Sequence, residues 1–175
     1  NSFVVGHVGR FSRVKNHRFL IKVFSEIYNE NKDAFLLMVG SGEEKDNIQQ
    51  VLDNSLLQDR YLILSNRSDV ADVMQAMDVF VFPSKYEGLG IALIEAQKSG
   101  LPCFASDKVP PVAKVTNLVE FCSLNDGEKK WARKIMKIKD LECRKKIINH
   151  GGKVPDTWDM KNVIQKLEKL YEGAL

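Results

Sequence analysis

Short apolar runs alternate with helix-forming stretches along this chain, and no other feature constrains its fold as much. The runs lie at residues 3–9, 34–40, 60–65, 78–84, 101–106 and 118–124. Several of them end in glycine or serine, where a buried strand would turn. Continuous apolar strands that alternate with helices are typical of a parallel sheet covered on both faces. The sequence therefore predicts an α/β fold, a Rossmann-like doubly wound parallel sheet flanked by helices.

Helices are expected between the strands and after the last of them. The predicted helical ranges are 16–31, 43–54, 69–76, 90–99, 126–138, 140–150 and 157–172. A length of 175 residues fits one domain of ordinary size, and neither an internal repeat nor a low-complexity linker divides the chain. We expect residues 1–175 to form a single domain.

Composition limits the partners and the compartment. Hydrophobic residues make up 44% and charged residues 28% of the chain, which is typical of a globular protein, and a net charge of +3 gives no reason to expect nucleic acid as a partner. Cys103, Cys122 and Cys143 lack CxxC spacing, and the first two lie in apolar runs, which favours buried thiols in a reducing compartment. No signal peptide or membrane-spanning run is evident, so a cytoplasmic location is expected. The chain begins inside a strand pattern without Met, which indicates a piece of a longer protein.

In a doubly wound sheet, ligands bind where the carboxyl ends of strands meet helix N-termini. The loop after the first strand reads "GHVGRFSRVKN". Its Gly6 and Gly9 would let the backbone approach a ligand, and Arg10 and Lys15 lie at the strand-to-helix junction, where cations and helix amides suit a phosphate or diphosphate. The alternative is a pair of solvated surface cations. Arg13 and Arg18, on the same stretch, are expected to be solvated.

A second loop, "YEGLGIAL", follows the strand at 78–84. Gly88 and Gly90 permit a tight turn whose N–H groups can face an anion. On a helical wheel Glu95 falls between Ile91, Ala92, Ala96 and Ser99, away from Gln97 and the main polar arc, which suggests that it holds a ligand. Its two oxygens suit the vicinal hydroxyls of a ribose, and Glu87 would contact another hydroxylated group further along the same ligand. The alternative is one capping glutamate and one incidental half-buried glutamate.

Common nucleotide fingerprints are missing. No loop matches G-x-G-x-x-G or the P-loop pattern, so "GSGEEK" at 40–45 is interpreted as a tight turn into a helix near Glu43. His7 is expected in the core, His17 near a helix start and His150 before a glycine pair. Their spacing predicts neither a metal site nor a catalytic triad.

Taken together, the loops resemble the donor-binding C-terminal half of GT-B retaining glycosyltransferases, of glycosyltransferase family 4 or group 1 type. The resemblance rests on "VGRFSRVKNHRFLIKVF", "FLLMVGSGEE" and "DVFVFPSKYEGLGIALIEAQKSGLPCFASD", with the E-x7-E pair Glu87 and Glu95 between "FPS" and "SGLP". It covers practically the whole chain. Within the family the chain looks most like bacterial capsular or exopolysaccharide enzymes.

The resemblance implies a role for each residue of these motifs. Arg10 and Lys15 would grip the diphosphate of a nucleotide-sugar and stabilise its charge as it leaves, and Glu87 would contact the donor sugar. The remaining implied donor contacts are Gly9, the Gly88, Leu89 and Gly90 backbone, Glu95 on the ribose, and Arg67 and Val70 near the base. No metal and no tightly bound cofactor is implied, and a UDP-sugar is the favoured donor.

The same resemblance implies partners that lie outside this chain. These are an N-terminal acceptor domain and a glycan or lipid-linked acceptor, which would place the parent enzyme at the inner face of the cell membrane. We therefore expect donor binding without efficient transfer. Peripheral membrane contact through the basic stretches 128–139 and 143–147 is an alternative to their being solvated helix faces.

Two departures from the family pattern stand out. Lys108, Pro110, Pro111 and Val112 replace the usual Gly-Gly and Glu, so the contacts of that loop are not carried over. The sequence "EAQKSG" replaces "EAMASG", a change expected to affect only packing or surface. The rival functions are a noncatalytic doubly wound nucleotide-binding or regulatory module and a GT-B epimerase or phosphorylase relative, although no pyridoxal-phosphate lysine context is found.

Overall fold

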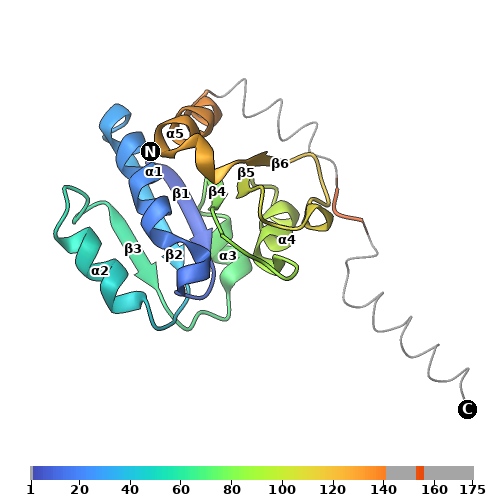
Figure 1. Cartoon of the computed structure of the whole chain (residues 1–175), viewed down its shortest axis with the longest axis horizontal. Helices are drawn as coiled ribbons and strands as arrows, with labels where there is room; N and C mark the ends of the chain where they lie inside the picture. The colour runs from blue at the N-terminus through green and yellow to red at the C-terminus, as the bar shows by residue number, and fades with distance from the viewer. Residues whose placement is uncertain (1, 141–152, 156–175) are drawn as a thin grey trace, which may run out of the picture.

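The computed structural model describes residues 2–140 and 153–155 (Figure 1). Its strands are β1 (Phe3–Val8), β2 (Ala34–Val39), β3 (Tyr61–Leu64), β4 (Val79–Phe82), β5 (Cys103–Ser106) and β6 (Val119–Cys122). Its α-helices are α1 (His17–Glu30), α2 (Lys45–Asp53), α3 (Val70–Met74), α4 (Ile91–Lys98) and α5 (Glu128–Met136). Short 3₁₀ turns lie at η1 (Arg13–Lys15), η2 (Pro111–Ala113), η3 (Leu124–Asp126) and η4 (Lys137–Lys139). The expected helices at 140–150 and 157–172, and Cys143, lie outside the described residues.

All six strands form one parallel sheet in the order β3-β2-β1-β4-β5-β6. The chain therefore winds outward from β1 to β3 and then returns to start the other half at β4 beside β1. This order confirms the predicted doubly wound sheet, and it makes the crevice between the carboxyl ends of β1 and β4 the expected ligand site.

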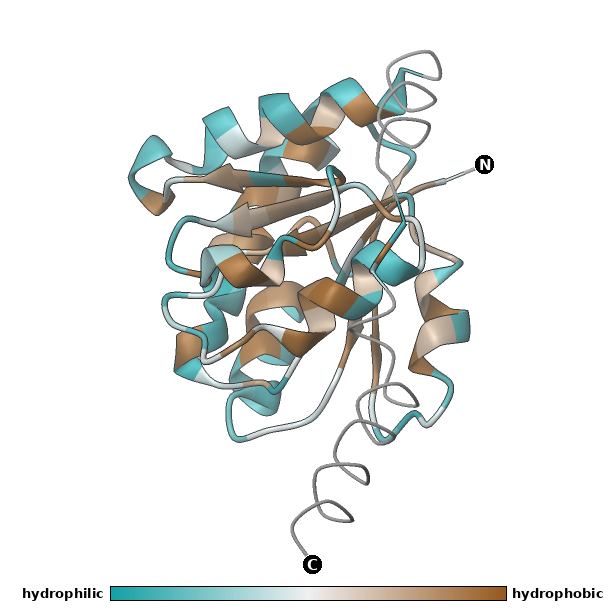
Figure 2. Cartoon of the chain, turned by 90° about the vertical axis from the view of Figure 1, so that its right-hand side faces the viewer, coloured by the Kyte–Doolittle hydropathy of each residue, from teal (hydrophilic) through white to brown (hydrophobic). Residues whose placement is uncertain are grey.

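Alternate residues of the strands build two apolar layers. On one face of the sheet, Val5, Leu36 and Val81 pack with α1, α2 and α5. On the other face, Leu37 and Phe80 pack with α3 and α4. Figure 2 shows the apolar strands enclosed between helices whose hydrophilic residues face outward. The four central strands read as continuous apolar runs because both of their faces are buried, whereas the edge strands β3 and β6 are more exposed.

Helix α5 is fastened to α1 through one large side chain. Trp131 is fully buried, meets the ring of Phe19 edge-on at 5.4 Å between centroids, and donates its indole N–H to the carbonyl of Ser123 at 2.8 Å. A tryptophan that buries its ring against another aromatic ring and hydrogen-bonds its indole N–H contributes more to stability than its buried area alone would predict. Among the described residues, no helix is long and apolar enough to cross a membrane.

Replacing this tryptophan should destabilise the domain strongly. We expect Trp131→Ala to lower the free energy of unfolding by about 3–5 kcal/mol, because a large cavity forms and Ser123 loses its donor. The matched control is Tyr86→Ala, since Tyr86 is 70% exposed; its effect should stay within about 0.5 kcal/mol. Urea unfolding followed by circular dichroism measures both, and a loss below about 1 kcal/mol for Trp131→Ala would contradict the packing described.

Candidate functional site

The loops after β1 and β4 are tied together across the crevice. The side-chain amide of Asn16, which caps α1 in a left-handed conformation (φ 60°), donates to the carbonyl of Pro83 at 3.1 Å. The backbone N–H of Lys85 donates to the carbonyl of Val14 at 2.8 Å. These bonds hold residues 14–16 against residues 83–85, and they fix the relative positions of the side chains that follow.

An ion pair spans the same junction. Lys15 donates to Oε1 of Glu87 at 2.5 Å, and the two side chains are only 18% and 9% exposed. The ammonium also lies over the ring of Phe82, 5.0 Å from its centroid. The structure thus brings together two residues that the sequence assigned to phosphate and sugar, from loops that are far apart in the chain.

The loops after β1 and β2 interlock through their backbones. The N–H of Phe11 donates to the carbonyl of Ser41 at 2.8 Å, and the N–H of Glu44 donates to the carbonyl of Phe11 at 2.9 Å. Only glycine fits here, because a Cβ on Gly40 would lie 2.0 Å from the carbonyl oxygen of Gly9. The "GSGEEK" segment is therefore more than a turn: it forms one wall of the site, and α2 begins at Lys45.

A pocket of about 540 Å³ opens at the carboxyl ends of β1, β2 and β3. Its lining residues are Val8, Gly9, Arg10, Val39, Gly40, Ser41, Gly42, Asn66, Arg67 and Val70. Four predicted site residues, Gly9, Arg10, Arg67 and Val70, thus share one cavity. Sequence reasoning missed Ser41, Gly42 and Asn66, although two glycines after a buried strand were a signal for the first two.

The cations of this pocket are already oriented by carboxylates. Arg10 pairs with Glu43 at 3.3 Å, and both side chains are more than half exposed. Arg67 directs Nε at 2.7 Å and a second nitrogen to the carboxylate of Asp69. These hydrogen bonds from Arg67 lower the pKa of Asp69. Two nitrogens on one edge of the Arg67 guanidinium are thus occupied by Asp69, while the residue lines the pocket.

Helix α4 corrects one prediction from the helical wheel. Glu95 is exposed, whereas Gln97 is buried at 2% exposure. The wheel placed Gln97 with the polar arc, but its amide turns inward and bonds to a neighbouring loop. The replacement of "EAMASG" by "EAQKSG" therefore changes a buried hydrogen-bond network, and not only packing or surface.

The loop that opens α4 is a separate part of the site. Gly90 adopts φ 80° immediately before Ile91, and Gly88 faces open space. Gly88, Leu89, Gly90 and Glu95 do not line the pocket that contains Arg10. The stem of Lys15 connects the two regions, because it lies 3.7 Å from the Cβ position of Gly9 while its ammonium reaches Glu87.

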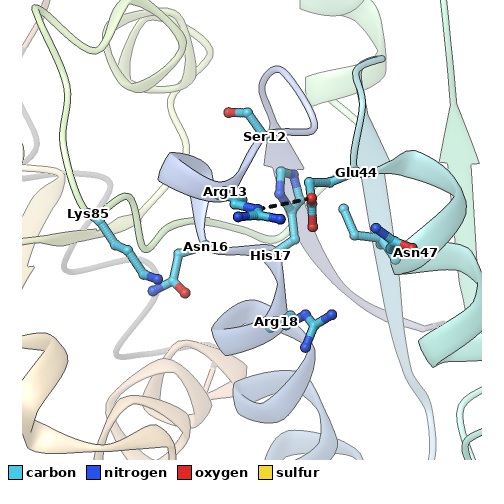
Figure 3. A pocket seen from close by; sticks show the side chains of 9 residues that line it. Ser12, Arg13, Asn16, His17, Arg18, Glu44, Asn47 and Lys85 are labelled. Atoms are coloured by element: carbon cyan, nitrogen blue, oxygen red, sulfur yellow. Dashed lines mark hydrogen bonds and ion pairs between the residues drawn. The ribbon is translucent and has the colours of Figure 1, made fainter.

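A second pocket, of about 350 Å³, is lined by residues from the β1–α1 loop and the start of α1 (Figure 3). Arg13, which reaches Glu44 at 3.5 Å, lines it together with Arg18 and Lys85. Arg13 and Arg18 are exposed, as predicted, and neither lines the pocket that contains Arg10. The loop thus separates its cations into two sets.

Two buried histidines lie beneath the loop. His7, on β1, donates Nδ1–H to the carbonyl of Val81 at 2.9 Å, and its ring meets that of His17 edge-on at 4.8 Å. Burial lowers the pKa of His7 to about 4. Burial, reinforced by the neighbouring His7, lowers the pKa of His17 to about 2. Both rings are neutral at pH 7, and the prediction of a core position for His7 is confirmed.

No group of three metal-binding side chains occurs among the described residues. Cys103 and Cys122 are free and buried, as predicted from their apolar surroundings. Burial raises the pKa of the Cys103 thiol far above its ordinary value, so this cysteine is an inert core residue.

The structure is a doubly wound α/β domain, and the candidate ligand site lies at its switch point. Residues 1–154 match the family model described as glycosyl transferases group 1, and the chain belongs to this family. It is 37% identical over 133 residues to the putative glycosyltransferase EpsF of Bacillus subtilis, covering 75% of this chain and 35% of EpsF. It is 32% identical over 184 residues to an Escherichia coli enzyme, covering 98% of this chain and 45% of that protein. That enzyme is the UDP-Gal:alpha-D-GlcNAc-diphosphoundecaprenol alpha-1,3-galactosyltransferase.

Solved structures share the fold. Anabaena HepE, crystallised with UDP and glucose, superposes with a TM-score of 0.79 at 21% identity, over 97% of this chain and 49% of that one. The C-terminal domain of the group 1 protein LpcC from Francisella tularensis superposes with a TM-score of 0.74 at 19% identity, over 85% of this chain and 82% of that domain. The chain spans less than half the length of the two curated relatives named above.

The buried histidines make stability depend on pH. Their folded-state pKa values lie below the ordinary value of 6.5, so the unfolded chain binds more protons between pH 6.5 and about 4. The contribution of the two neutral histidines to the free energy of unfolding is therefore fully present above pH 6.5, and it is lost as the pH decreases. From pH 7 to pH 5 we expect a loss of about 2 kcal/mol for each histidine, measured by urea unfolding at the two pH values.

A variant isolates one of the two contributions. His17→Leu fills the space of the buried ring with an apolar side chain and removes one titrating group. The free energy of unfolding of this variant should therefore fall by about 2 kcal/mol less between pH 7 and pH 5 than that of the wild type. An unchanged loss would show that His17 does not titrate on unfolding.

Proposed function

We propose that this chain binds the nucleotide-sugar donor of a retaining glycosyltransferase at the carboxyl ends of β1–β4. The complete protein would transfer the sugar to a glycan or lipid-linked acceptor in capsular or exopolysaccharide synthesis. The observation that carries the proposal is the Lys15–Glu87 pair at the switch point, directly beside the pocket that Gly9 and Arg10 line. The acceptor domain would belong to the portion of the relatives' length that this chain does not span.

Lys15 and Arg10 would hold the diphosphate. They extend from the loop that joins β1 to α1, and α4, whose N-cap residue Gly90 makes no side-chain hydrogen bond, begins in the loop that follows β4. As the bond between sugar and diphosphate breaks, negative charge grows on the diphosphate. Two cations and helix amides would stabilise that charge without requiring a metal ion. In this role Arg10 and Lys15 act on the leaving group, and the Gly88–Gly90 backbone would contact the phosphates and the sugar.

The base would occupy the outer part of the site at the end of β3, and the ribose would lie between the base and the diphosphate. Arg67 and Val70 line the pocket at the end of β3, and a planar guanidinium is suited to stacking on a flat base. The exposed carboxylate of Glu95 would accept hydrogen bonds from the ribose hydroxyls, and Glu87 would accept from the sugar. A UDP-sugar is the favoured donor, since the E. coli relative is named for UDP-Gal and HepE was crystallised with UDP.

A noncatalytic nucleotide-binding module is the main rival. Such a module would share the fold, but its function would not require the shielded Lys15–Glu87 pair between the pocket at Arg67 and Val70 and the start of α4. Binding of a nucleotide is expected from both a donor-binding domain and a noncatalytic module. The effect of substituting Glu87 on the binding of UDP and of a UDP-sugar distinguishes the two.

Nucleotide binding can be tested on the chain itself. Calorimetric titration with UDP, GDP and ADP should show selective binding of one nucleotide, and we expect UDP. Lys15→Ala should weaken it by about 10- to 100-fold, through loss of a charge-assisted hydrogen bond, and Glu95→Ala by about 10-fold. Arg10→Ala should weaken it similarly, whereas the matched control Arg13→Ala, in the same loop but facing the second pocket, should change it by less than about 2-fold. Absence of binding to any of the three nucleotides at millimolar concentration would contradict the proposal.

Glu87 offers a test in the opposite direction. Because its carboxylate competes with a diphosphate for Lys15, Glu87→Gln should bind UDP about 3- to 10-fold more tightly than the wild type. A UDP-sugar should gain less, because the weaker amide acceptor reduces its contact with the sugar. If Glu87→Gln instead weakens UDP as Lys15→Ala does, the carboxylate is orienting Lys15 toward the phosphates and is not competing for it.

A further inference from the structure

Gln97 connects helix α4 to the segment that follows η2. Its side-chain N–H groups donate to the carbonyls of Leu93 at 2.9 Å and Ala113 at 2.7 Å. Its oxygen accepts from the backbone N–H of Val115 at 2.9 Å and from the N–H and hydroxyl of Thr116 at 2.9 and 3.0 Å. At 2% exposure, the amide uses both its donor and its acceptor capacity inside the protein.

Gln97 bonds to the end of the segment 107–116, and an earlier part of this same segment covers Gly90. A Cβ on Gly90 would lie 3.3 Å from a methyl group of Val109 and 3.7 Å from Cβ of Ala113. The start of this loop is fastened to the sheet, since the N–H of Lys108 donates to Oγ of Ser106 at 3.1 Å. Its far end is fastened to α4 through Gln97.

We infer that Gln97 is a positioning residue for the phosphate end of the donor site. Its amide sets how closely the segment 107–116 lies against the Gly90 turn, where the leading N–H groups of α4 would meet the distal phosphate. Gln97 is seven residues beyond Gly90, about 10 Å along the helix axis, so it acts through the loop and does not touch the donor. The inference rests on the proposed function, because it concerns the same site.

The effect of losing the amide follows from the groups it satisfies. Without it, the carbonyl of Ala113 and the N–H groups of Val115 and Thr116 would lack their partner beneath the surface, which is costly. The segment would have to move toward water to recover hydrogen bonds, and Val109 would move away from Gly90. The base pocket at Arg67 and Val70 is built on β1–β3 and would not change.

The test compares two ligands that differ only in the distal phosphate. Binding of UDP and of UMP is measured by calorimetry for the wild type, Gln97→Met and Val109→Ala, each shown to be folded by circular dichroism. Methionine keeps the side-chain volume and removes the hydrogen bonds. Gln97→Met should weaken UDP by about 5- to 10-fold and UMP by less than about 2-fold, and Val109→Ala, which loosens the loop without touching the amide, should show the same selectivity. The matched control is Ile135→Ala, a fully buried change on α5 that should lower stability without selective loss of UDP.

The outcomes separate this inference from the proposed function. If the wild type binds UDP while Gln97→Met and Val109→Ala bind it equally well, or lose UDP and UMP to the same extent, the positioning role is wrong and the donor site stands. If the wild type fails to bind UDP, the proposed function falls and the inference falls with it.

Discussion

The pairing of β1 with both β2 and β4 is the constraint on which the rest of the structure depends. Val5 and Gly6 lie in register with Leu36 and Leu37 on one side and with Val79 and Phe80 on the other. The chain leaves β1 and β4 toward opposite layers of helices, so the loops that follow these strands diverge and leave a crevice between them. The contacts of residues 14–16 with residues 83–87 then hold the two edges of that crevice at a fixed distance.

Backbone contacts supply the rigidity of this site. The loop after β2 approaches the loop after β1 so closely that Gly42, like Gly40, has no room for a side chain: its Cβ would lie 2.5 Å from the carbonyl oxygen of Phe11. Neutral aromatic rings support the β1–α1 loop from below, where His7 stacks with Phe82 and His17 meets Phe11 edge-on. A site built this way presents its cations on a preorganised surface, which favours binding of a charged ligand because little ordering is left to be done.

Much of this could be predicted from the sequence. The four central strands gave a clear signal, because burial on both faces requires an uninterrupted apolar run. Arg10, Lys15 and Glu87 were selected by their places in loops that follow strands, whereas Glu95 was selected from its place on a helical wheel. The environment of Gln97 could not be predicted. In a helix as short and as apolar as α4, the helical wheel does not distinguish a face that meets solvent from one that meets a loop, and the partners of Gln97 lie 16 to 19 residues away in the chain. The role of Ser41 and Gly42 was missed for a similar reason, since loop-to-loop contacts leave no periodic pattern.

The two cations of the site are held in different ways, and this difference bears on donor choice. Arg10 pairs with Glu43 in the open, where an ion pair contributes little, so a phosphate can take its place readily. Lys15 pairs with Glu87 in a shielded position, where separating the charges costs more. A diphosphate that draws Lys15 away leaves the carboxylate of Glu87 without its partner, unless sugar hydroxyls donate to it in return. Under the proposed function, the pair would therefore couple recognition of the phosphates to recognition of the sugar, and a complete nucleotide-sugar would satisfy both charges where a bare nucleotide satisfies one.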